Sequence, residues 1–271
     1  MRTRIITGVI ITVVLIALCL LAPLWLIYLV LQLAAVIGLF EILRMAAPRA
    51  PFTDRLGALV AGVGLTALAY LWPPALLGAV LLTPVVVLGS FLLRPFPIAT
   101  VAQRMSGALT AVFYVGLLFA ALINLATRAA GPYSGRALLL LGAVVFLGDT
   151  GAYFTGRFLG RHKLYPSVSP KKTIEGALGG VAGSLLGAVV MKLLITTALG
   201  WGDIVAVVVP CSILGQIGDL TESLFKRSYG VKDSGTILPG HGGVLDRMDG
   251  ILFAAPYLLL YHTAVSPLNL A

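Results

Sequence analysis

Charged residues are scarce in this sequence of 271 residues: only 11% are Asp, Glu, Lys or Arg, whereas 59% are hydrophobic. Soluble domains carry charge on about a quarter of their residues, so the composition excludes an ordinary soluble globular protein. Long apolar runs recur from one end to the other, and the period-two alternation that a transmembrane β-barrel needs is missing. The sequence therefore predicts an all-α, polytopic integral membrane protein.

The apolar runs give the expected number of membrane spans. A bilayer core about 30 Å thick needs roughly 20 apolar residues of helix, and about nine runs meet this length. Arg2 and Arg4 before the first run resemble the start of a secretory signal, but no small-x-small cleavage site precedes Pro23, so we expect an uncleaved helix. The nine predicted spans lie near residues 5–22, 24–43, 57–72, 75–93, 106–126, 137–156, 176–199, 204–223 and 250–265.

Cysteine, histidine and familiar nucleotide motifs are also in short supply. The two cysteines, Cys19 and Cys211, both fall within apolar runs, which indicates neither a disulfide framework nor a metal site. The sequence has no GxxxxGK[ST] loop for binding phosphate. It has no evident internal repeat either, so a transporter built from inverted repeats gains no support.

Basic residues outnumber acidic ones by 19 to 10, but their distribution indicates topology rather than a nucleic-acid partner. If the N-terminus is cytoplasmic, Arg128 and Arg136 alone fall in the opposite loops, and Lys192 lies within a span. This positive-inside bias predicts a cytoplasmic N-terminus and an outside C-terminus. Cations at the cytoplasmic surface would also attract anionic lipid headgroups. We therefore expect a protein of the cell (inner) membrane that contacts membrane lipid and binds no nucleic acid.

The two parts of the chain differ in their polar content. Residues 1–135 have short loops marked by proline, and Glu41 with Arg44 is most simply a solvated helix end. We expect this part to be a scaffold, with lipid access or oligomer contacts as further roles. Residues 136–271 are predicted to form a catalytic transmembrane domain with cytoplasmic loops 157–175 and 224–249.

Small residues recur at three- and four-residue spacing in the seventh predicted span. This pattern predicts close packing against another helix and no chemistry of its own. The residues are Gly176, Gly179, Gly180, Gly183, Ser184 and Gly187.

Carboxylates cluster where the eighth span ends and the ninth begins. Asp219 shares one helical face with Glu222 and Lys226, and Asp246 and Asp249 share a face at the start of the ninth span. A surface ladder of acidic and basic side chains, or a helix-dipole complement, is the simpler alternative. Asp219 lies a turn deeper than a surface ladder explains, because carboxylates inside a membrane need a partner or a cavity. Asp219, Asp246 and Asp249 are therefore candidate ligands of Mg²⁺, which favours carboxylate and phosphate oxygens.

Two basic cytoplasmic segments supply donors suited to phosphate oxygens. In one, glycines let backbone N–H groups approach an anion, and His241 is expected to contact phosphate or order the loop rather than bind metal. In the other, the residues precede a helix N-terminus, which favours phosphate, although two adjacent lysines also occur simply for topology. The first segment offers Lys226, Arg227, Lys232, Ser234, His241, Gly242, Gly243 and Arg247; the second offers Ser169, Lys171, Lys172 and Thr173.

Carboxylates that bind metal, facing several fixed cations, are typical of nucleotidyl or phosphoryl transfer. At the cytoplasmic surface, one substrate could be a lipid and the other a soluble nucleotide. Two other classes stay open on these residues. One is a membrane kinase or transferase that uses CTP on an isoprenoid alcohol, and the other is a lipid transporter whose carboxylates bind a coupling cation.

The segment "SLFKRSYGVKDSGTILPGHGGVLDRMD", residues 223–249, resembles the signature of the phosphatidate cytidylyltransferases (CDP-diacylglycerol synthases). The segments "GDTGAYFTGRFLGRHKLYPSVSPKKTIEG" and "GQIGDLTESLFKR" are similar to family segments too, so the resemblance covers roughly residues 145–265. One departure is Gly250, where many relatives carry serine. The matching signature positions are Ser223, Lys226, Arg227, Lys232, Asp233, Pro239, His241, Gly242, Gly243, Asp246, Arg247 and Asp249.

The resemblance implies an enzyme that transfers CMP from CTP to phosphatidate and forms CDP-diacylglycerol and pyrophosphate. It implies a divalent metal held by Asp219, Asp246 and Asp249, with room for a second cation whose identity the sequence does not specify. Asp219, Asp246, Asp249, Lys226 and Arg247 are the expected catalytic residues. The resemblance further implies phosphate contacts from Lys171, Lys172, Lys226, Arg227, Lys232 and Arg247. A homodimer is left open as an assembly.

Overall fold

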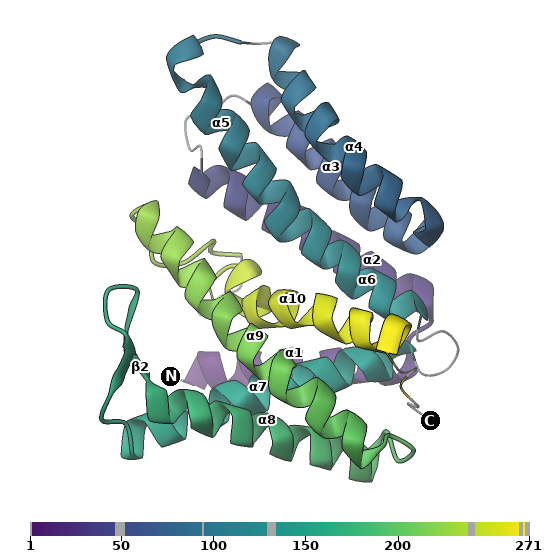
Figure 1. The fold of residues 1–271 in the computed structure, drawn as a ribbon, viewed down its shortest axis with the longest axis vertical. Helices are drawn as coiled ribbons and strands as arrows, with labels where there is room; N and C mark the ends of the chain where they lie inside the picture. The colour runs from purple at the N-terminus through teal and green to yellow at the C-terminus, as the bar shows by residue number, and fades with distance from the viewer. Residues whose placement is uncertain are drawn as a thin grey trace.

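The computed structural model of the protein describes residues 2–46, 52–93, 95–128, 134–237, 242–265 and 268. Within them the chain is nearly all helical (Figure 1). The helices are α1 (Arg2–Leu21), α2 (Leu24–Ala46), α3 (Phe52–Leu71), α4 (Leu76–Ser90), α5 (Ile98–Ala111), α6 (Leu118–Arg128), α7 (Ser134–Phe158), α8 (Ile174–Leu194), α9 (Trp201–Ser228) and α10 (Leu245–Leu260). Short 3₁₀ turns η1 (Pro73–Ala75) and η2 (Phe91–Leu93) flank α4, and π-helical segments η3 (Val112–Leu117) and η4 (Tyr261–Val265) follow α5 and α10.

Every predicted apolar run falls on a helix, and α5, η3 and α6 together occupy the fifth run. In the described part of the chain, six helices are long and apolar enough to cross a membrane. They are Leu24–Ala46, Pro73–Leu93, Ile98–Arg128, Gly135–Phe158, Ile174–Leu194 and Trp201–Ser228. These helices make the chain a membrane protein. The count of nine spans and the sides of the termini stay predictions.

The helices form two groups that meet along α6 and α10 (Figure 1). In one group α3 packs against α2, α4 and α6, and in the other α7 packs along α8, which also contacts α9. Helix α10 packs against both α9 and α6. The two parts predicted from the sequence therefore share a contact surface, and their division at residue 135 stays a prediction.

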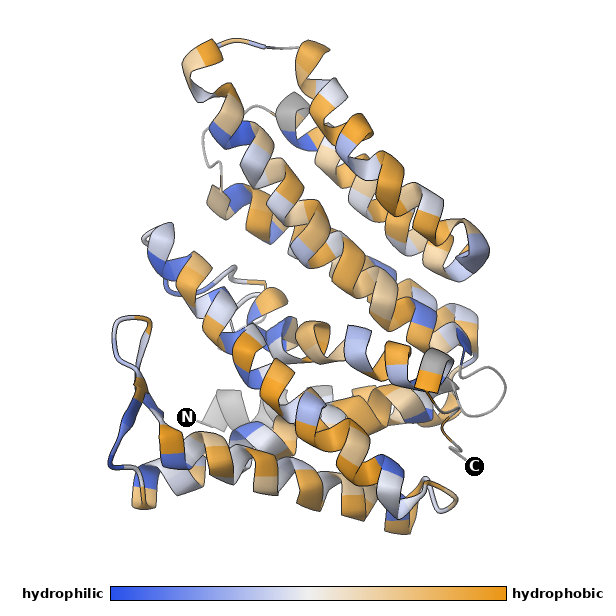
Figure 2. Ribbon diagram, viewed as in Figure 1, coloured by the Kyte–Doolittle hydropathy of each residue, from blue (hydrophilic) through white to orange (hydrophobic). Residues whose placement is uncertain are grey.

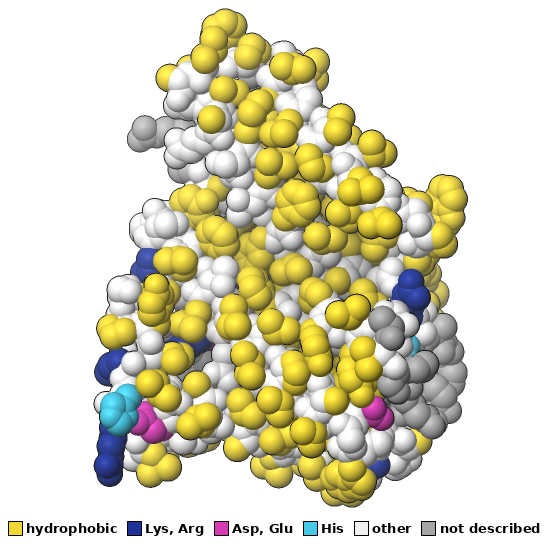
Figure 3. Space-filling view, in the orientation of Figure 1, with side chains coloured by type: hydrophobic (Ala, Val, Ile, Leu, Met, Phe, Trp, Pro, Cys, Tyr) yellow, Lys and Arg dark blue, Asp and Glu magenta, His cyan; other side chains and the backbone are white. Residues whose placement is uncertain are grey.

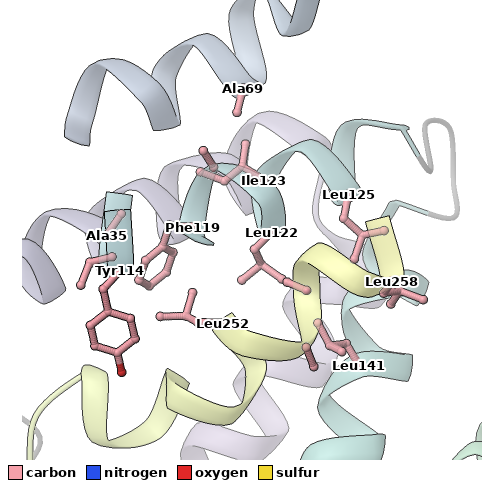
Figure 4. Close-up of a cluster of buried hydrophobic side chains, with 14 of the residues drawn as sticks. Ala35, Ala69, Tyr114, Phe119, Leu122, Ile123, Leu125, Leu141, Leu252 and Leu258 are labelled. Carbon is pink, nitrogen blue, oxygen red and sulfur yellow. The ribbon is translucent and has the colours of Figure 1, made fainter. Parts of the chain in front are cut away.

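A core of apolar side chains fills the junction between the groups. Phe119 and Leu122 on α6 lie toward Leu252 and Leu258 on α10, whereas Ile123 lies on the side of α6 toward Ala69 of α3, as Figure 4 shows. The five large side chains among these are at most 2% exposed. The face of the molecule shown in Figure 3 is also mostly apolar. Large side chains such as those of Leu92, Leu93 and Leu77 are more than 70% exposed. In a bilayer such surfaces face lipid, where burial from water needs no protein partner.

Glycines line the contact between α7 and α8, here called the glycine seam, as the spacing of small residues predicted. A Cβ added at Gly151 would lie 2.5 Å from the backbone oxygen of Gly179, and one at Gly187 would lie 2.8 Å from that of Ala143. Ser184, on the same face of α8, donates a hydrogen bond to the backbone oxygen of Val144 on α7 at 2.7 Å. Only small residues permit this backbone approach.

The nearly all-α fold includes one small β element, a two-stranded hairpin within the described residues. Strand β1 (Lys163–Tyr165) pairs antiparallel with β2 (Ser169–Thr173), and the hairpin joins α7 to α8. It projects from the helices as a polar arm (Figure 2). The glycine- and proline-containing segment was assigned to a loop because strands this short leave little periodic pattern in a sequence. Pairing of the two strands gives Lys171 and Lys172 of β2 fixed backbone positions.

Candidate functional site

The carboxyl end of α9 and the start of α10 are joined by a buried ion pair. Lys226 Nζ lies 2.6 Å from Asp246 Oδ1 and 3.2 Å from Glu222 Oε1. The side chains of Lys226 and Asp246 are 11% and 8% exposed, and Glu222 is fully buried. Two of the predicted site residues, Lys226 and Asp246, thus meet in the structure, together with Glu222.

The second oxygen of Asp246 accepts hydrogen bonds from the α9–α10 loop, defined as its described residues 229–237 and 242–244. Oδ2 accepts hydrogen bonds from Ser234 N at 2.9 Å and from Gly243 N at 2.8 Å, and Ser234 Oγ lies 3.0 Å from it. Burial alone would raise the pKa of Asp246, but the hydrogen bonds from Lys226, Gly243 and Ser234 hold that pKa below its ordinary value. Asp246 therefore organises the loop as an ionised carboxylate.

Glu41 of α2 reaches the same loop, which corrects the expectation of a solvated helix end. It is 5% exposed, whereas Arg44 is exposed. Its Oε2 accepts hydrogen bonds from Ser234 Oγ at 3.0 Å and Leu245 N at 2.9 Å, and its Oε1 accepts one from Val244 N at 3.0 Å. Sequence proximity suggested Arg44 as a partner because contacts across about 200 residues leave no local signal.

Glu222 and Asp249 add two further carboxylates beside the ion pair. Asp249 lies against Glu222 and interacts electrostatically with Asp219. The helices approach closely here, because a Cβ added at Gly218 would lie 2.5 Å from the backbone oxygen of Asp249. Neither oxygen of Glu222 accepts a hydrogen bond from the described protein atoms. The carboxylates of Glu222, Asp246 and Asp249 therefore lie close together, and Lys226 pairs with the first two of them.

Strand β2 delivers a second lysine to this acidic region. Lys172 Nζ lies 2.6 Å from Asp219 Oδ2, and the two side chains are 27% and 35% exposed. The strand ends at Thr173, whose hydroxyl caps α8 by accepting a hydrogen bond from Gly176 N at 3.1 Å. The hairpin is further tied to α8 by Glu175, which accepts backbone hydrogen bonds from Arg161 at 3.0 Å and His162 at 3.2 Å. Lys172 is thereby fixed over α9.

Asp149 of α7 belongs to the same cluster, although the sequence placed it only near a span boundary. It interacts electrostatically with Asp219, Asp249, Lys172 and Arg247. Its position in "GDTG" beside the glycine seam was the available signal. Four helices or strands therefore contribute charges to one region: α7, β2, α9 and α10.

The other predicted substrate contacts lie around this region. Lys171, Arg227, Lys232 and Arg247 are exposed, Ser169 is half-buried in β2, and Ser234 is buried. Gly242 adopts φ +83°, a conformation that favours glycine, and a Cβ there would also meet Asp246 Oδ2 at 2.6 Å. Gly243 donates to Asp246 as described, and His241 lies outside the described residues. The roles of all these residues in binding stay predictions.

Tyr114 was missed by the sequence reasoning. It lies on the π-helical segment η3, its ring stacks on Phe225 with centroids 5.5 Å apart, and its hydroxyl points away from the apolar cluster in Figure 4. The hydroxyl has no hydrogen-bond partner among the described protein atoms. It interacts electrostatically with Glu222, Asp249, Asp219 and Asp246. A π-helical segment is often found at functional sites. The sequence contained no sign of this one, because Tyr114 and its neighbours form an apolar run.

The carboxylate region has the donor chemistry of a site for a hard cation. Asp149, Asp219 and Asp249 repel one another electrostatically, and the buried Glu222 shares the ammonium group of Lys226 with Asp246. No three His, Cys, Asp or Glu side chains of the described residues are already arranged as a ligand set. The residues fit Mg²⁺ bound through one or two carboxylates and substrate phosphates, which requires no closed protein cage.

Comparison with known proteins agrees with this chemistry. A family model described as the cytidylyltransferase family matches residues 2–265. The chain belongs to the cytidylyltransferase family. It is 49% identical to a phosphatidate cytidylyltransferase of Staphylococcus haemolyticus over 150 residues, which is 55% of this chain and 56% of that protein. It is 44% identical to a phosphatidate cytidylyltransferase of Brucella suis over 174 residues, which is 63% of each.

These cytidylyltransferase relatives match over only part of their length. The chain spans between 56% and 63% of the two relatives just named. Family membership confirms the resemblance inferred from residues 223–249.

Proposed function

We propose that this chain is a phosphatidate cytidylyltransferase that transfers CMP from CTP to phosphatidate and forms CDP-diacylglycerol and pyrophosphate. Two relatives at 44% and 49% identity carry this name. The observation on which the proposal rests is the junction of β2, α7, α9 and α10, where the partly exposed Lys172–Asp219 pair lies beside Asp149, Asp249 and Arg247.

The reaction is proposed as an in-line displacement at phosphorus. A phosphate oxygen of phosphatidate forms a bond to the α-phosphorus of CTP as the bond from that phosphorus to the bridging oxygen of pyrophosphate breaks. Because the nucleophile is already an anion, no strong general base is needed. Lys171, Lys172 and Arg247 lower the repulsion between the two anionic substrates and stabilise the departing charge. Lys226, Arg227, Lys232, Ser169, Ser234, Thr173, His241, Gly242 and Gly243 complete the proposed phosphate contacts.

Asp219 and Asp249 are proposed to hold Mg²⁺ together with substrate phosphates. Asp246 is the third proposed ligand, and its direct coordination requires Lys226 to give up Oδ1, to which it is now paired. The bound cation would supply charge neutralisation on the transferring and leaving phosphoryl oxygens. A second cation could be held beside the buried Glu222, where further carboxylates lie close by.

The proposed location is the cell (inner) membrane, with the site on the cytoplasmic side. The positive-inside bias supports a cytoplasmic N-terminus and an outside C-terminus, and the hairpin that carries Lys171 and Lys172 supports entry of CTP from water. Phosphatidate would enter sideways from the inner leaflet. Light scattering of the purified enzyme would show whether it forms a homodimer.

Purified protein supplied with Mg²⁺, CTP and phosphatidate tests the activity. We expect both CDP-diacylglycerol and pyrophosphate, and no product when phosphatidate is replaced by a polyprenol. Product from the polyprenol instead would identify a kinase or transferase that acts on isoprenoid alcohols. Vesicles that take up lipid with no pyrophosphate released would identify a transporter.

A further inference from the structure

We propose that Glu41 is a positioning residue of this enzyme: it fixes the α9–α10 loop and, through Ser234, the carboxylate of Asp246. The proposal rests on the function proposed above. It also gives the first part of the chain a direct task, because Glu41 lies on α2, far in sequence from the signature. No distinct ligand or partner is needed for this role.

Glu41 replaces a capping residue that α10 lacks. Val244, the N-cap of α10, makes no side-chain cap hydrogen bond. The free N–H groups of a helix start are normally satisfied by a Ser, Thr, Asp or Asn at the N-cap. Here the N–H groups of Val244 and Leu245 donate to Glu41 at 3.0 and 2.9 Å. A carboxylate at this position also complements the positive end of the helix dipole.

The contact with Ser234 extends this cap to the site. Ser234 Oγ lies 3.0 Å from Glu41 Oε2 and 3.0 Å from Asp246 Oδ2. A hydroxyl has one proton to donate, and Asp246 Oδ2 already receives the N–H groups of Ser234 and Gly243. The hydroxyl proton is therefore available to Glu41. The Ser234 hydroxyl then donates to Glu41 while the backbone N–H of Ser234 donates to Asp246, which pairs with Lys226.

Two glycines of the loop make room for this carboxylate. A Cβ added at Gly243 would lie 2.6 Å from Glu41 Oε1, and one at Gly235 would collide with the same oxygen. Gly235 and Gly243 therefore accommodate a side chain that arrives from α2. The spacing of glycines in the loop is explained by Glu41 as well as by an approaching phosphate.

The expected consequence of losing Glu41 is misplacement of Asp246 rather than loss of nucleotide affinity. Glu41 contacts backbone groups and Ser234, and the cations of the hairpin lie on other elements. Removing such a supporting contact typically lowers activity by about 10- to 100-fold. We expect Glu41→Gln to lower kcat within this range, with KM for CTP within about threefold of wild type. The amide keeps the size of the side chain but has only one acceptor oxygen. The two oxygens of Glu41 now accept three hydrogen bonds, from Ser234, Val244 and Leu245.

The matched control is Asp203→Asn. Asp203 is also a carboxylate that accepts a hydrogen bond from a hydroxyl, that of Tyr261 at 2.7 Å, but it lies at the opposite end of α9. Both variants are measured for kcat, KM for CTP, melting temperature in detergent, and hydrogen exchange of the peptide that contains Val244 and Leu245. We expect low kcat and faster exchange in that peptide for Glu41→Gln alone, at a melting temperature near that of the control.

Ser234→Ala provides a second test that does not remove the cap. It should lower kcat in the same direction, and the double variant with Glu41→Gln should be little slower than the slower single variant, because both act on Asp246 through one contact. A folded Glu41→Gln with kcat within threefold of wild type would overturn the proposal. An equal loss in Asp203→Asn would overturn it too. If Glu41→Gln fails to fold, Ser234→Ala decides: a lowered kcat with KM for CTP within threefold of wild type supports the proposal. An unchanged kcat overturns it, and so does a raised KM, which would assign Ser234 to phosphate binding alone.

The failure of the proposed function would look different. Wild-type protein that forms no CDP-diacylglycerol would remove the proposed activity, whereas hydrogen exchange still reports on the contact of Glu41 with α10. Slow exchange of Val244 and Leu245 in wild type, lost in Glu41→Gln, would then support the structural half of the proposal. Equal exchange in the two proteins would overturn it.

Discussion

Two lysine–carboxylate pairs meet at α9 with the same N–O separation of 2.6 Å, yet their surroundings differ. Lys172–Asp219, between β2 and α9, is 27% and 35% exposed. Lys226–Asp246, between α9 and α10, is 11% and 8% exposed, and backbone groups surround its carboxylate. An exposed pair is weak and readily exchanged for other ions. A buried pair is costly to break, because the remaining charge is left without water or a partner.

The difference assigns distinct tasks to two pairs that look alike in the sequence. Lys172 can leave Asp219 when a phosphate and a cation arrive, since water already reaches both side chains. Lys226 and Asp246 instead hold the α9–α10 loop in one arrangement.

Asp246→Asn should have the largest effect, because it removes turnover and also destabilises the protein. The neutral amide leaves Lys226 with Glu222 as its remaining partner and cannot accept all the present donors. We expect a stability loss of about 3 kcal/mol, the lower end for breaking a buried pair. Product formation and the melting temperature in detergent would check this. Near-normal values of both would remove the distinction between the pairs.

Asp219→Asn should abolish turnover while leaving stability almost unchanged. The pair it breaks is partly exposed, and such pairs contribute about 0 to 1 kcal/mol. The comparison with Asp246→Asn under the same conditions is the control. A fall in melting temperature as large as that of Asp246→Asn would show that both pairs are structural, and retained turnover would remove Asp219 from the metal proposal.

Replacing Lys171 and Lys172 together by alanine should lower kcat/KM for CTP roughly tenfold or more, since a hydrogen bond to a charged group contributes about 1.5 to 3 kcal/mol. The fall can appear in KM or in kcat. Arg161→Ala on the same hairpin, whose backbone N–H rather than its side chain bonds Glu175, serves as a control. If neither constant changes in the double variant, the lysines have a topological role only.

Tyr114→Phe should have the smallest effect and the opposite sign for stability. A buried hydroxyl without a partner costs about 1 to 3 kcal/mol, so its removal should raise the melting temperature slightly. The ring contacts with Phe225 and Phe253 remain. A large loss of stability would mean that the hydroxyl has a partner, and the buried region would then be better satisfied than the described contacts indicate.

The sequence predicted the elements that depend on local pattern. Apolar length located the helices, the spacing of glycine and serine located the α7–α8 contact, and residues 223–249 located the family. The hairpin was missed because β1 and β2 are too short for a periodic signal. The carboxylates on α9 and α10 were found because they share faces of single helices.

Contacts between distant elements were beyond the reach of the sequence. Glu41 looked like a solvated helix end because its partners lie in the α9–α10 loop, and Asp149 looked like a boundary residue because its neighbours come from three other elements. Tyr114 gave no signal within an apolar run. In each case the chemistry depends on which helices pack together. Such packing leaves no regular spacing of residues that could be recognised in a single sequence.

The glycine seam between α7 and α8 has a mechanical consequence. Backbones in direct contact cannot slide past each other without a collision, so α7 and α8 form one rigid unit. Asp149 lies on α7, and Lys172 directly precedes Thr173, the N-cap residue of α8. The close α7–α8 contact therefore sets the spacing between the backbone positions that carry these two opposite charges.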